Sequence, residues 1–298
     1  MGKFVNPFTD MGFKLIFGQE VSKPVLIEFL NSLLVNERKI RDLKFLDKEQ
    51  LGATSDDRSL IYDVYCELED GGHIIVEMQY KSQPFFKSRS VFYTSKAIVN
   101  QGEKGAEWEY KLKPVYMIAL LNFKLKDISD EFRTDVALMD MKHKTLFSDK
   151  VRQIYLQLPL FKKEPDECEN VFDRFIYVLK HMDILERMPW AAQNSVFQKL
   201  ASIAEVGALS KEDRIKYDES LRKFRDTISV MEGQRLEGKA EGLAEGRAEG
   251  RAEGRAEGRT EGLAEGKAEV AVKLKAMGLS VSEITEATGL SPEQVEAL

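Results

Sequence analysis

Apolar and polar residues alternate along several short segments of the first part of the chain, and this period of two is typical of β-strands. We expect strands at about 43–46, 60–69, 73–80, 115–122, 133–139 and 154–158. One intervening stretch, about 87–101, has helical spacing, and another helix is expected after Ser22, with Pro24 in its first turn. Helices that interrupt a short run of strands predict an α/β core with a mixed sheet flanked by helices.

The pattern changes twice farther along the chain. After about residue 161 the apolar spacing becomes helical, and at about residue 233 varied sequence gives way to a Glu-Gly-Xaa-Ala repeat. We therefore expect an α/β domain at 1–165, a helical extension at 166–232, the repeat at 233–269 and a small helical tail at 270–298.

The repeat places glycine at every fourth position from Gly238 to Gly266. On a helix this period drifts by about 40° per repeat, and each glycine costs about 1 kcal/mol relative to alanine. Two interpretations remain open. The segment is either a helix whose glycines allow close approach of a second helix, as in a homo-oligomer, or a flexible spacer, and we favour the helix.

The tail carries two helix-start signatures, Ser280 with Glu283 and Ser291 with Gln294. Together they resemble a helix-turn-helix. The second helix, however, is negatively charged where a helix that reads DNA needs Arg, Lys or Asn. We therefore favour a small interaction module over sequence readout.

Composition narrows the class of protein. With 298 residues, 43% of them hydrophobic, the chain can bury a full core, and no apolar run is long enough for a membrane span. We expect a cytoplasmic protein without structural zinc, because only Cys66 and Cys168 are present and the histidines show no ligand spacing. The formal net charge of -6 excludes nucleic-acid coating by bulk charge, so any such contact must be local.

Three polar residues occur at alternate positions of two neighbouring expected strands. Asp63 lies on the first strand, and Glu77 and Gln79 lie on the second, each between apolar residues of even number. A hairpin that keeps both apolar faces together pairs residues whose numbers sum to an even value. We expect the loop to be Asp70–Gly72, which sets Asp63 opposite Gln79, with Glu77 diagonal to it.

Two carboxylates on one face can hold Mg²⁺ or another divalent cation, so Asp63 and Glu77 are the expected metal ligands. Gln79 would orient an attacking water by hydrogen bonding. Acidic residues on the solvent face of an ordinary hairpin are the plain alternative. The position of Glu77 in a strongly apolar strand favours a metal site, because a carboxylate there is costly without a partner.

The order of these motifs resembles that of the PD-(D/E)XK nuclease family transposases, also called recombination-promoting nucleases. The resemblance covers about residues 3–290 and depends on Thr9-Asp10-Met-Gly-Phe-Lys14, Asp63 and Glu77-Met-Gln79 in this order, with the Glu-Gly-rich tail. It implies a restriction-endonuclease-like fold and a DNA endonuclease tied to recombination, mobile elements or defence. Asp63 and Glu77 would be metal ligands, Gln79 would replace the lysine of the wider superfamily, and Asp10 and Lys14 would lie near the site.

A stretch without acidic residues follows the expected site, from Met78 to Gly102. Its candidate DNA contacts are Lys81, Lys87, Arg89, Tyr93 and Lys96. Arg89, Tyr93 and Lys96 share one helix face, and a local positive surface is suited to a phosphate backbone. In the alternative interpretation these side chains are simply solvated, while Phe92, Ala97 and Val99 pack the helix.

The sequence thus predicts a metal-dependent DNA endonuclease. Two rivals remain: a catalytically lapsed nuclease fold that only binds DNA, and an oligomeric interaction protein whose long tail assembles partners.

Overall fold

The computed structural model describes residues 2–50, 60–102, 109–126 and 128–298. These residues form two compact units, 1–225 and 226–298, which are described separately.

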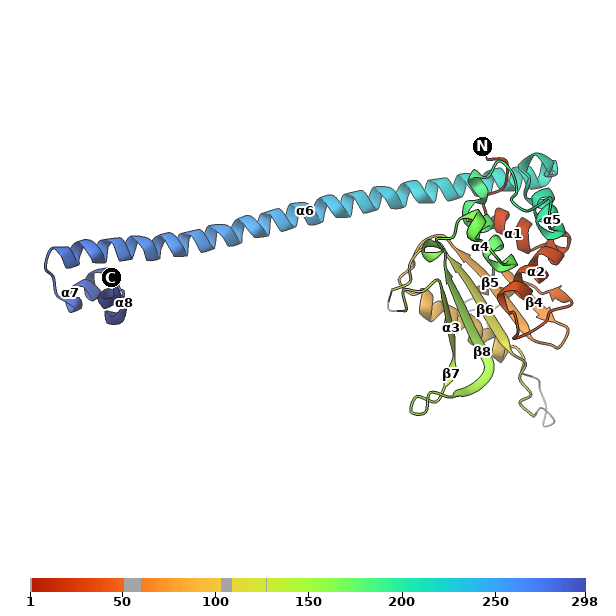
Figure 1. Ribbon diagram of the computed structural model, residues 1–298, viewed down its shortest axis with the longest axis horizontal. Coiled ribbons are helices and arrows are strands. Elements are labelled where there is room, and N and C mark those ends of the chain that lie inside the picture. Colours follow the sequence, from red (N-terminus) through yellow and green to blue (C-terminus); the bar gives the residue numbers. More distant parts are fainter. Residues whose placement is uncertain (1, 51–59, 103–108, 127) are drawn as a thin grey trace. The chain divides into compact units, whose positions relative to one another are not determined.

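The first unit contains a six-stranded mixed sheet in the order β1-β4-β5-β6-β8-β7 (Figure 1). The β5, β6 and β8 strands run parallel to one another, and the outer pairs are antiparallel. In chain order the strands are β1 (Leu43–Phe45), β4 (Val64–Leu68), β5 (His73–Gln79), β6 (Val115–Leu121), β7 (Arg133–Met139) and β8 (Leu146–Gln157). Two short strands, β2 (Glu49–Gln50) and β3 (Leu60–Ile61), pair separately.

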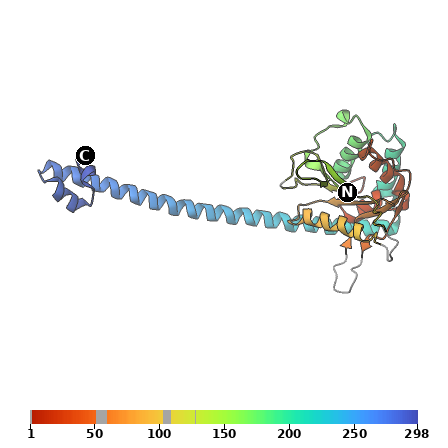
Figure 2. The same cartoon turned by 90° about the horizontal axis from the view of Figure 1, so that it is seen from below.

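Helices cover both faces of the sheet (Figures 1 and 2). One face packs against four helices: α1 (Asp10–Phe17), α2 (Lys23–Leu33), α4 (Val171–His181) and α5 (Ser195–Ala204). The other face packs against α3 (Phe86–Val99). The predicted α/β class, a mixed sheet flanked by helices, is confirmed.

Along the central strands, residues of even and odd number lie on opposite faces of the sheet. Ile74, Val76 and Met78 of β5 join the core under α1 and α2, whereas Ile75 joins the core under α3. Strands buried on both faces are expected to be apolar almost throughout. Glu77 therefore points toward α3, on a face of the sheet that a helix covers. The alternative interpretation, in which these acidic residues lie on the solvent face of an ordinary hairpin, is wrong for Glu77.

The predicted strand at 60–69 is interrupted. It forms β3 and β4, with Tyr62 and Asp63 between them. The Tyr62 amide donates to the Lys48 carbonyl oxygen at 2.9 Å, so the chain leaves the main sheet there and pairs with the segment around β2. The predicted strand at 154–158 is longer than expected, because β8 begins at Leu146 and its first part pairs with β7 through an irregular register.

Helices α4 and α5 pack in the same core as α1 and α2. Phe29 of α2 is fully buried, and its ring centroid lies 5.1 Å from that of Phe17 in α1 and 5.6 Å from that of Phe175 in α4. The helices of the expected extension thus pack in the same hydrophobic core as α1, α2 and one face of the sheet.

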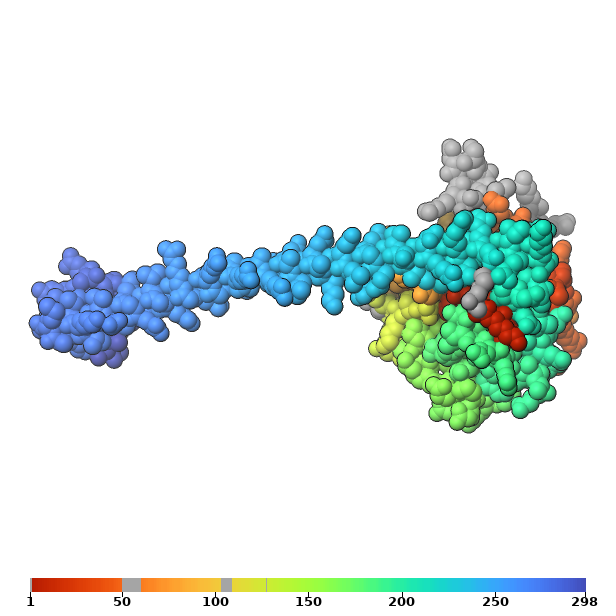
Figure 3. All heavy atoms as spheres, turned by 90° about the horizontal axis from the view of Figure 1, so that it is seen from above, coloured from red at the N-terminus to blue at the C-terminus, as the bar shows by residue number. Residues whose placement is uncertain are grey.

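The N-terminal residues lie against α5 and the start of α6 (Lys211–Ala276) (Figure 3). The Val5 amide donates to the Ala204 carbonyl oxygen at 2.8 Å, and the Asn6 amide donates to the Tyr217 hydroxyl at 2.8 Å. Because Tyr217 is buried, the first turns of α6 belong to the core that holds the N-terminus.

The second unit consists of the rest of α6, then α7 (Val281–Thr288) and α8 (Pro292–Ala297). Both predicted helix starts are confirmed, since Ser280 and Ser291 form capping boxes with Glu283 and Gln294. The whole repeat is helical within α6.

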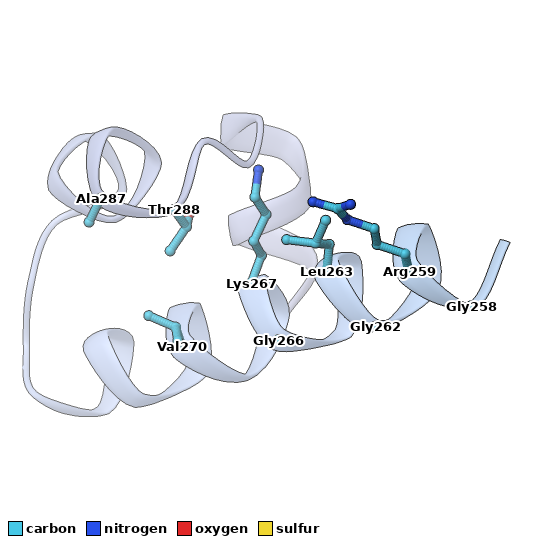
Figure 4. Close-up of a pocket in the computed structure, with 9 residues that line it drawn as sticks. All are labelled: Gly258, Arg259, Gly262, Leu263, Gly266, Lys267, Val270, Ala287 and Thr288. Carbon is cyan, nitrogen blue, oxygen red and sulfur yellow. The ribbon is translucent and has the colours of Figure 1, made fainter. Parts of the chain in front are cut away.

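Ala271, Ile284 and Val295 form the small core of this unit. A groove of about 550 Å³ beside it is lined by Gly262, Leu263, Gly266 and Val270 of α6 and by Ala287 and Thr288 at the end of α7 (Figure 4). Within the described part of the chain, no helix has the length and apolar character of a membrane span.

Candidate active site

The loop of the β4–β5 hairpin begins one residue earlier than predicted and has the same length. The Leu68 amide donates to the Gly72 carbonyl oxygen at 2.7 Å, which leaves Glu69–Gly71 as the loop. Gly71 has a φ of 79°, the left-handed conformation that commonly ends a three-residue hairpin loop and that glycine adopts without strain. The glycine that decides the loop is Gly71, and the expected Asp70–Gly72 loop is wrong by one residue.

This loop shifts the register by two residues. Val64 lies opposite Val76 and Tyr65 opposite Ile75, so Asp63 lies opposite Glu77 and not opposite Gln79. The numbers of paired residues still sum to an even value, so Asp63, Glu77 and Gln79 still lie on one face of the hairpin. The Asp63 amide donates to Oε1 of Glu77 at 3.1 Å.

Asp63 lies where the chain leaves the sheet. Continuing the register would pair Tyr62 with Met78, but Tyr62 turns away and the Met78 amide donates to Oδ2 of Asp63 at 2.9 Å. The Asp63 carboxylate thus replaces a backbone carbonyl at the end of the ladder. Its backbone and side chain both bond to β5, which fixes the carboxylate beside Glu77.

Glu77 is 2% exposed and lies at the centre of a chain of hydrogen bonds. Nε2 of Gln79 donates to Oε2 of Glu77 at 3.3 Å, and Nη2 of Arg89 donates to Oε1 of Gln79 at 2.7 Å. Arg89 also donates to the side chain of Gln83. The guanidinium therefore determines which way the Gln79 amide faces.

Two neighbouring carboxylates in this buried place resist ionisation. Burial raises the pKa of Asp63 to about 6, and the negative charge of Asp10 adds to the rise. Burial, and then the charge of Asp63, raise the pKa of Glu77 well above its ordinary range, while Arg89 opposes this. The two anions destabilise each other unless a positive charge lies between them or nearby.

The donor set suits a hard divalent cation. Carboxylate oxygens of Asp63 and Glu77 are the ligands that Mg²⁺ prefers, and Mg²⁺ usually takes only one or two carboxylates and keeps several waters. Among the described residues no cluster of three or more His, Cys, Asp and Glu side chains is placed to hold a metal. Asp63 and Glu77 are thus the two carboxylates that would supply the protein ligands of such a cation.

Asp10 and Lys14 belong to α1, whose start is held next to the end of β5. The Phe8 ring packs edge-on against Tyr80, with ring centroids 5.5 Å apart, and Thr9 caps the helix. The negative charge of Asp10 contributes to the raised pKa of Asp63, after burial as the main cause. Lys14 lies one turn farther along α1, and its side chain is exposed.

The candidate DNA contacts differ in position. Lys87 is exposed, whereas Lys81 and Lys96 are half-buried. Tyr93 is only 8% exposed and its hydroxyl donates to the Ile61 carbonyl oxygen, so it does not lie on the open surface expected of a DNA contact. Arg89 is half-buried and holds Gln79, a link that the sequence spacing did not reveal.

The expectation that Phe92 and Val99 pack α3 is wrong, because they are 51% and 68% exposed. Ala97 is buried as that interpretation supposed. Phe85, which the sequence did not single out, is 78% exposed at the start of α3.

Comparison with known proteins supports one family. The sequence model of the PD-(D/E)XK nuclease family transposase matches residues 7–234, which include the sheet, its flanking helices and the Asp63–Glu77 pair. No curated protein and no solved structure matches the chain. PD-(D/E)XK nucleases generally use divalent metal ions, in keeping with the donor set found here. The match spans well over half of the chain, and the protein therefore belongs to the PD-(D/E)XK nuclease family transposases.

Proposed function

We propose that the protein is a DNA endonuclease that hydrolyses phosphodiester bonds with Mg²⁺ or a similar cation, in recombination, mobile-element or defence processes. The observation that carries this proposal is the buried Asp63–Glu77 pair. A fold that holds two carboxylates together, with Glu77 only 2% exposed, makes their ionisation costly, and a bound cation would offset that cost.

Asp63 and Glu77 would hold the cation. When bound, a divalent cation lowers the pKa of a coordinated water and offsets charge on the scissile phosphate. Gln79 carries two amide hydrogens on Nε2; one bonds to Glu77, and the other would orient the attacking water. Arg89 holds the amide in that orientation through Oε1. Gln79 would thus position the attacking water without supplying the positive charge of a lysine.

The DNA would lie across the acid-free surface that follows β5. Lys81, Lys87 and Lys96 would contact phosphates, so the affinity for DNA should fall as the salt concentration rises. We place this activity in the cytoplasm, where the two buried free cysteines, Cys66 and Cys168, would remain reduced.

Plasmid cleavage tests the proposal. Supercoiled DNA should become nicked or linear with the wild-type protein and Mg²⁺, and should stay intact with EDTA. Asp63→Asn and Glu77→Gln should each lower the rate by roughly 100-fold or more, because each removes a charged ligand. Glu67→Gln, on the same hairpin but outside the site, is the matched control and should cleave like the wild type.

Two outcomes would favour the rivals. If the wild type binds DNA with salt-dependent affinity but never cleaves it, the site has lapsed. If truncation after Met231 abolishes every activity while residues 1–231 stay folded and bind metal, the tail's assembly of partners is the main function.

A further inference from the structure

A hollow of about 740 Å³ lies beside the candidate active site, between the loop that follows β5 and the first turns of α3. Its wall includes Gln83, Phe85, Ser88, Arg89 and Phe92. Sites for small molecules have volumes of about 300–1,000 Å³ and combine apolar walls with a few polar groups. The hollow therefore has the size of a site for one nucleotide-sized group and is too small for a folded partner.

Two aromatic side chains are displayed in this hollow. Phe85 and Phe92 are 78% and 51% exposed, although each could bury a large apolar area. Phe85 directly precedes α3 and Phe92 lies seven positions later within it, with Arg89 between them, and all three side chains line the hollow. Exposed aromatic side chains beside a functional site indicate a ligand surface.

The charge and polarity of the hollow indicate which class of ligand it would bind. None of the described residues that line the hollow is acidic, and Arg89 supplies the positive charge. Gln83 and Ser88 offer hydrogen-bonding groups at the edge of the aromatic surface. Flat aromatic faces, an arginine and a few amide or hydroxyl groups are the features that bind an unstacked nucleobase.

Arg89 connects the hollow to the carboxylates. The same guanidinium that lines the wall donates to Gln79 at 2.7 Å, and Gln79 donates to Glu77 at 3.3 Å. The wall of the hollow and the Asp63–Glu77 pair are thus joined by two hydrogen bonds, through Arg89 and Gln79.

We propose that this hollow binds one nucleobase, swung out of the stack, from the DNA strand whose backbone passes the Asp63–Glu77 pair. The inference rests on the proposed nuclease function and adds a substrate class to it. A base in a paired duplex is stacked on its neighbours and cannot enter, whereas a base in a single strand or a mismatch leaves the stack at lower cost. The preferred substrate is therefore single-stranded or mismatched DNA.

Metal-free binding measures this preference without cleavage. Fluorescence anisotropy in EDTA would compare one labelled sequence as a single strand, as a duplex with one central mismatch and as a fully paired duplex. The wild type should bind the first two at least about tenfold more tightly than the third. Phe85→Ala and Phe92→Ala should each reduce that preference by about fivefold or more. About fivefold is the lower end of the loss of affinity expected when one base-stacking contact is removed.

Phe147→Ala is the matched control. Phe147 is 79% exposed, almost the same as Phe85. It lies at the start of β8, whereas the residues level with Gln79 of β5 are Leu121 of β6 and Gln157 at the end of β8. The substitution removes an equivalent exposed ring at the opposite end of the sheet and should leave the preference unchanged.

The outcomes separate the two hypotheses. Equal wild-type binding to paired and unpaired DNA, or an unchanged preference in both phenylalanine variants, would overturn the base pocket and leave plasmid cleavage as the test of hydrolysis. A preference that is lost in Phe85→Ala and Phe92→Ala, but not in Phe147→Ala, supports the pocket even if the wild type fails to cleave with Mg²⁺.

Discussion

Glu77 is held where a charge is costly, and its neighbours explain how the fold tolerates it. The Glu77 carboxylate accepts hydrogen bonds from the Asp63 amide and from Gln79, and Arg89 in turn donates to Gln79. These donors offset part of the desolvation cost, but the second carboxylate adds repulsion. Under the proposed function, a bound cation would offset this repulsion.

The variant Glu77→Gln should stabilise the metal-free protein. Glutamine can still accept from the Asp63 amide through Oε1 but loses the hydrogen bond from Gln79. Removal of one of two buried carboxylates outweighs that loss, so the free energy of unfolding at pH 8 in EDTA should rise by roughly 1–3 kcal/mol. Urea unfolding followed by circular dichroism measures this. Glu67→Gln should change it by less than about 0.5 kcal/mol. A loss of stability in Glu77→Gln would show that the charge itself is well compensated.

At the scale of elements, the sheet is stabilised by two helical layers. The parallel strands β5, β6 and β8 bury both faces, one under α3 and the other under α1, α2, α4 and α5. Because α3 covers the Glu77 side, the carboxylate is shielded from water. Because the start of α1 is held near the end of β5 by Phe8 and Tyr80, Asp10 lies near Asp63.

Substitution of Phe29 by alanine tests whether α4 and α5 belong to the domain with the sheet. Phe29 is fully buried and its ring contacts helices α1 and α4, so its loss should cost about 3–5 kcal/mol in a single unfolding transition. Val35→Ala, just beyond α2 and 60% exposed, is the control and should cost less than about 0.5 kcal/mol. Two separate transitions in the urea curve would instead indicate an autonomous helical extension.

At the scale of the whole molecule, the chain divides into a folded unit that carries the site and a second unit formed by most of α6 with two short helices. The glycines of the repeat lie within a continuous helix, and a Cβ added at Gly246, Gly250 or Gly254 would meet nothing within 4 Å. Within one chain these glycines only weaken the helix. A stripe of small residues kept at that cost is what close contact with a second helix requires.

Replacing Gly246, Gly250 and Gly254 by alanine should therefore have two opposite effects. The isolated segment 233–269 should become more helical by circular dichroism, since each substitution favours helix by about 1 kcal/mol. Self-association of the full chain, measured by sedimentation equilibrium, should weaken because the methyl groups would keep a second helix away. Self-association that is unchanged by the substitutions, or absent from the wild type, would argue against the homo-oligomer and leave the repeat as a spacer.

The sequence by itself determined the features that depend on a few neighbouring residues. Alternation along residues 60–69 and 73–80 determined that Asp63, Glu77 and Gln79 share one face, because side chains of a strand point to alternate sides. Local side-chain to backbone hydrogen bonds determined the starts of α7 and α8, and the ordered motifs around Asp10, Asp63 and Glu77 indicated the family.

Only the tertiary structure decided which residues oppose each other and how deeply they are buried. The left-handed conformation of Gly71 set the register that places Asp63 opposite Glu77. The departure of Tyr62 from the sheet freed the Met78 amide for the Asp63 carboxylate. Packing of α3 buried Glu77, brought Arg89 to Gln79 and left Phe85 exposed. The backbone conformation of one turn residue and contacts between segments distant in the chain produced these outcomes, and local periodicity encodes neither.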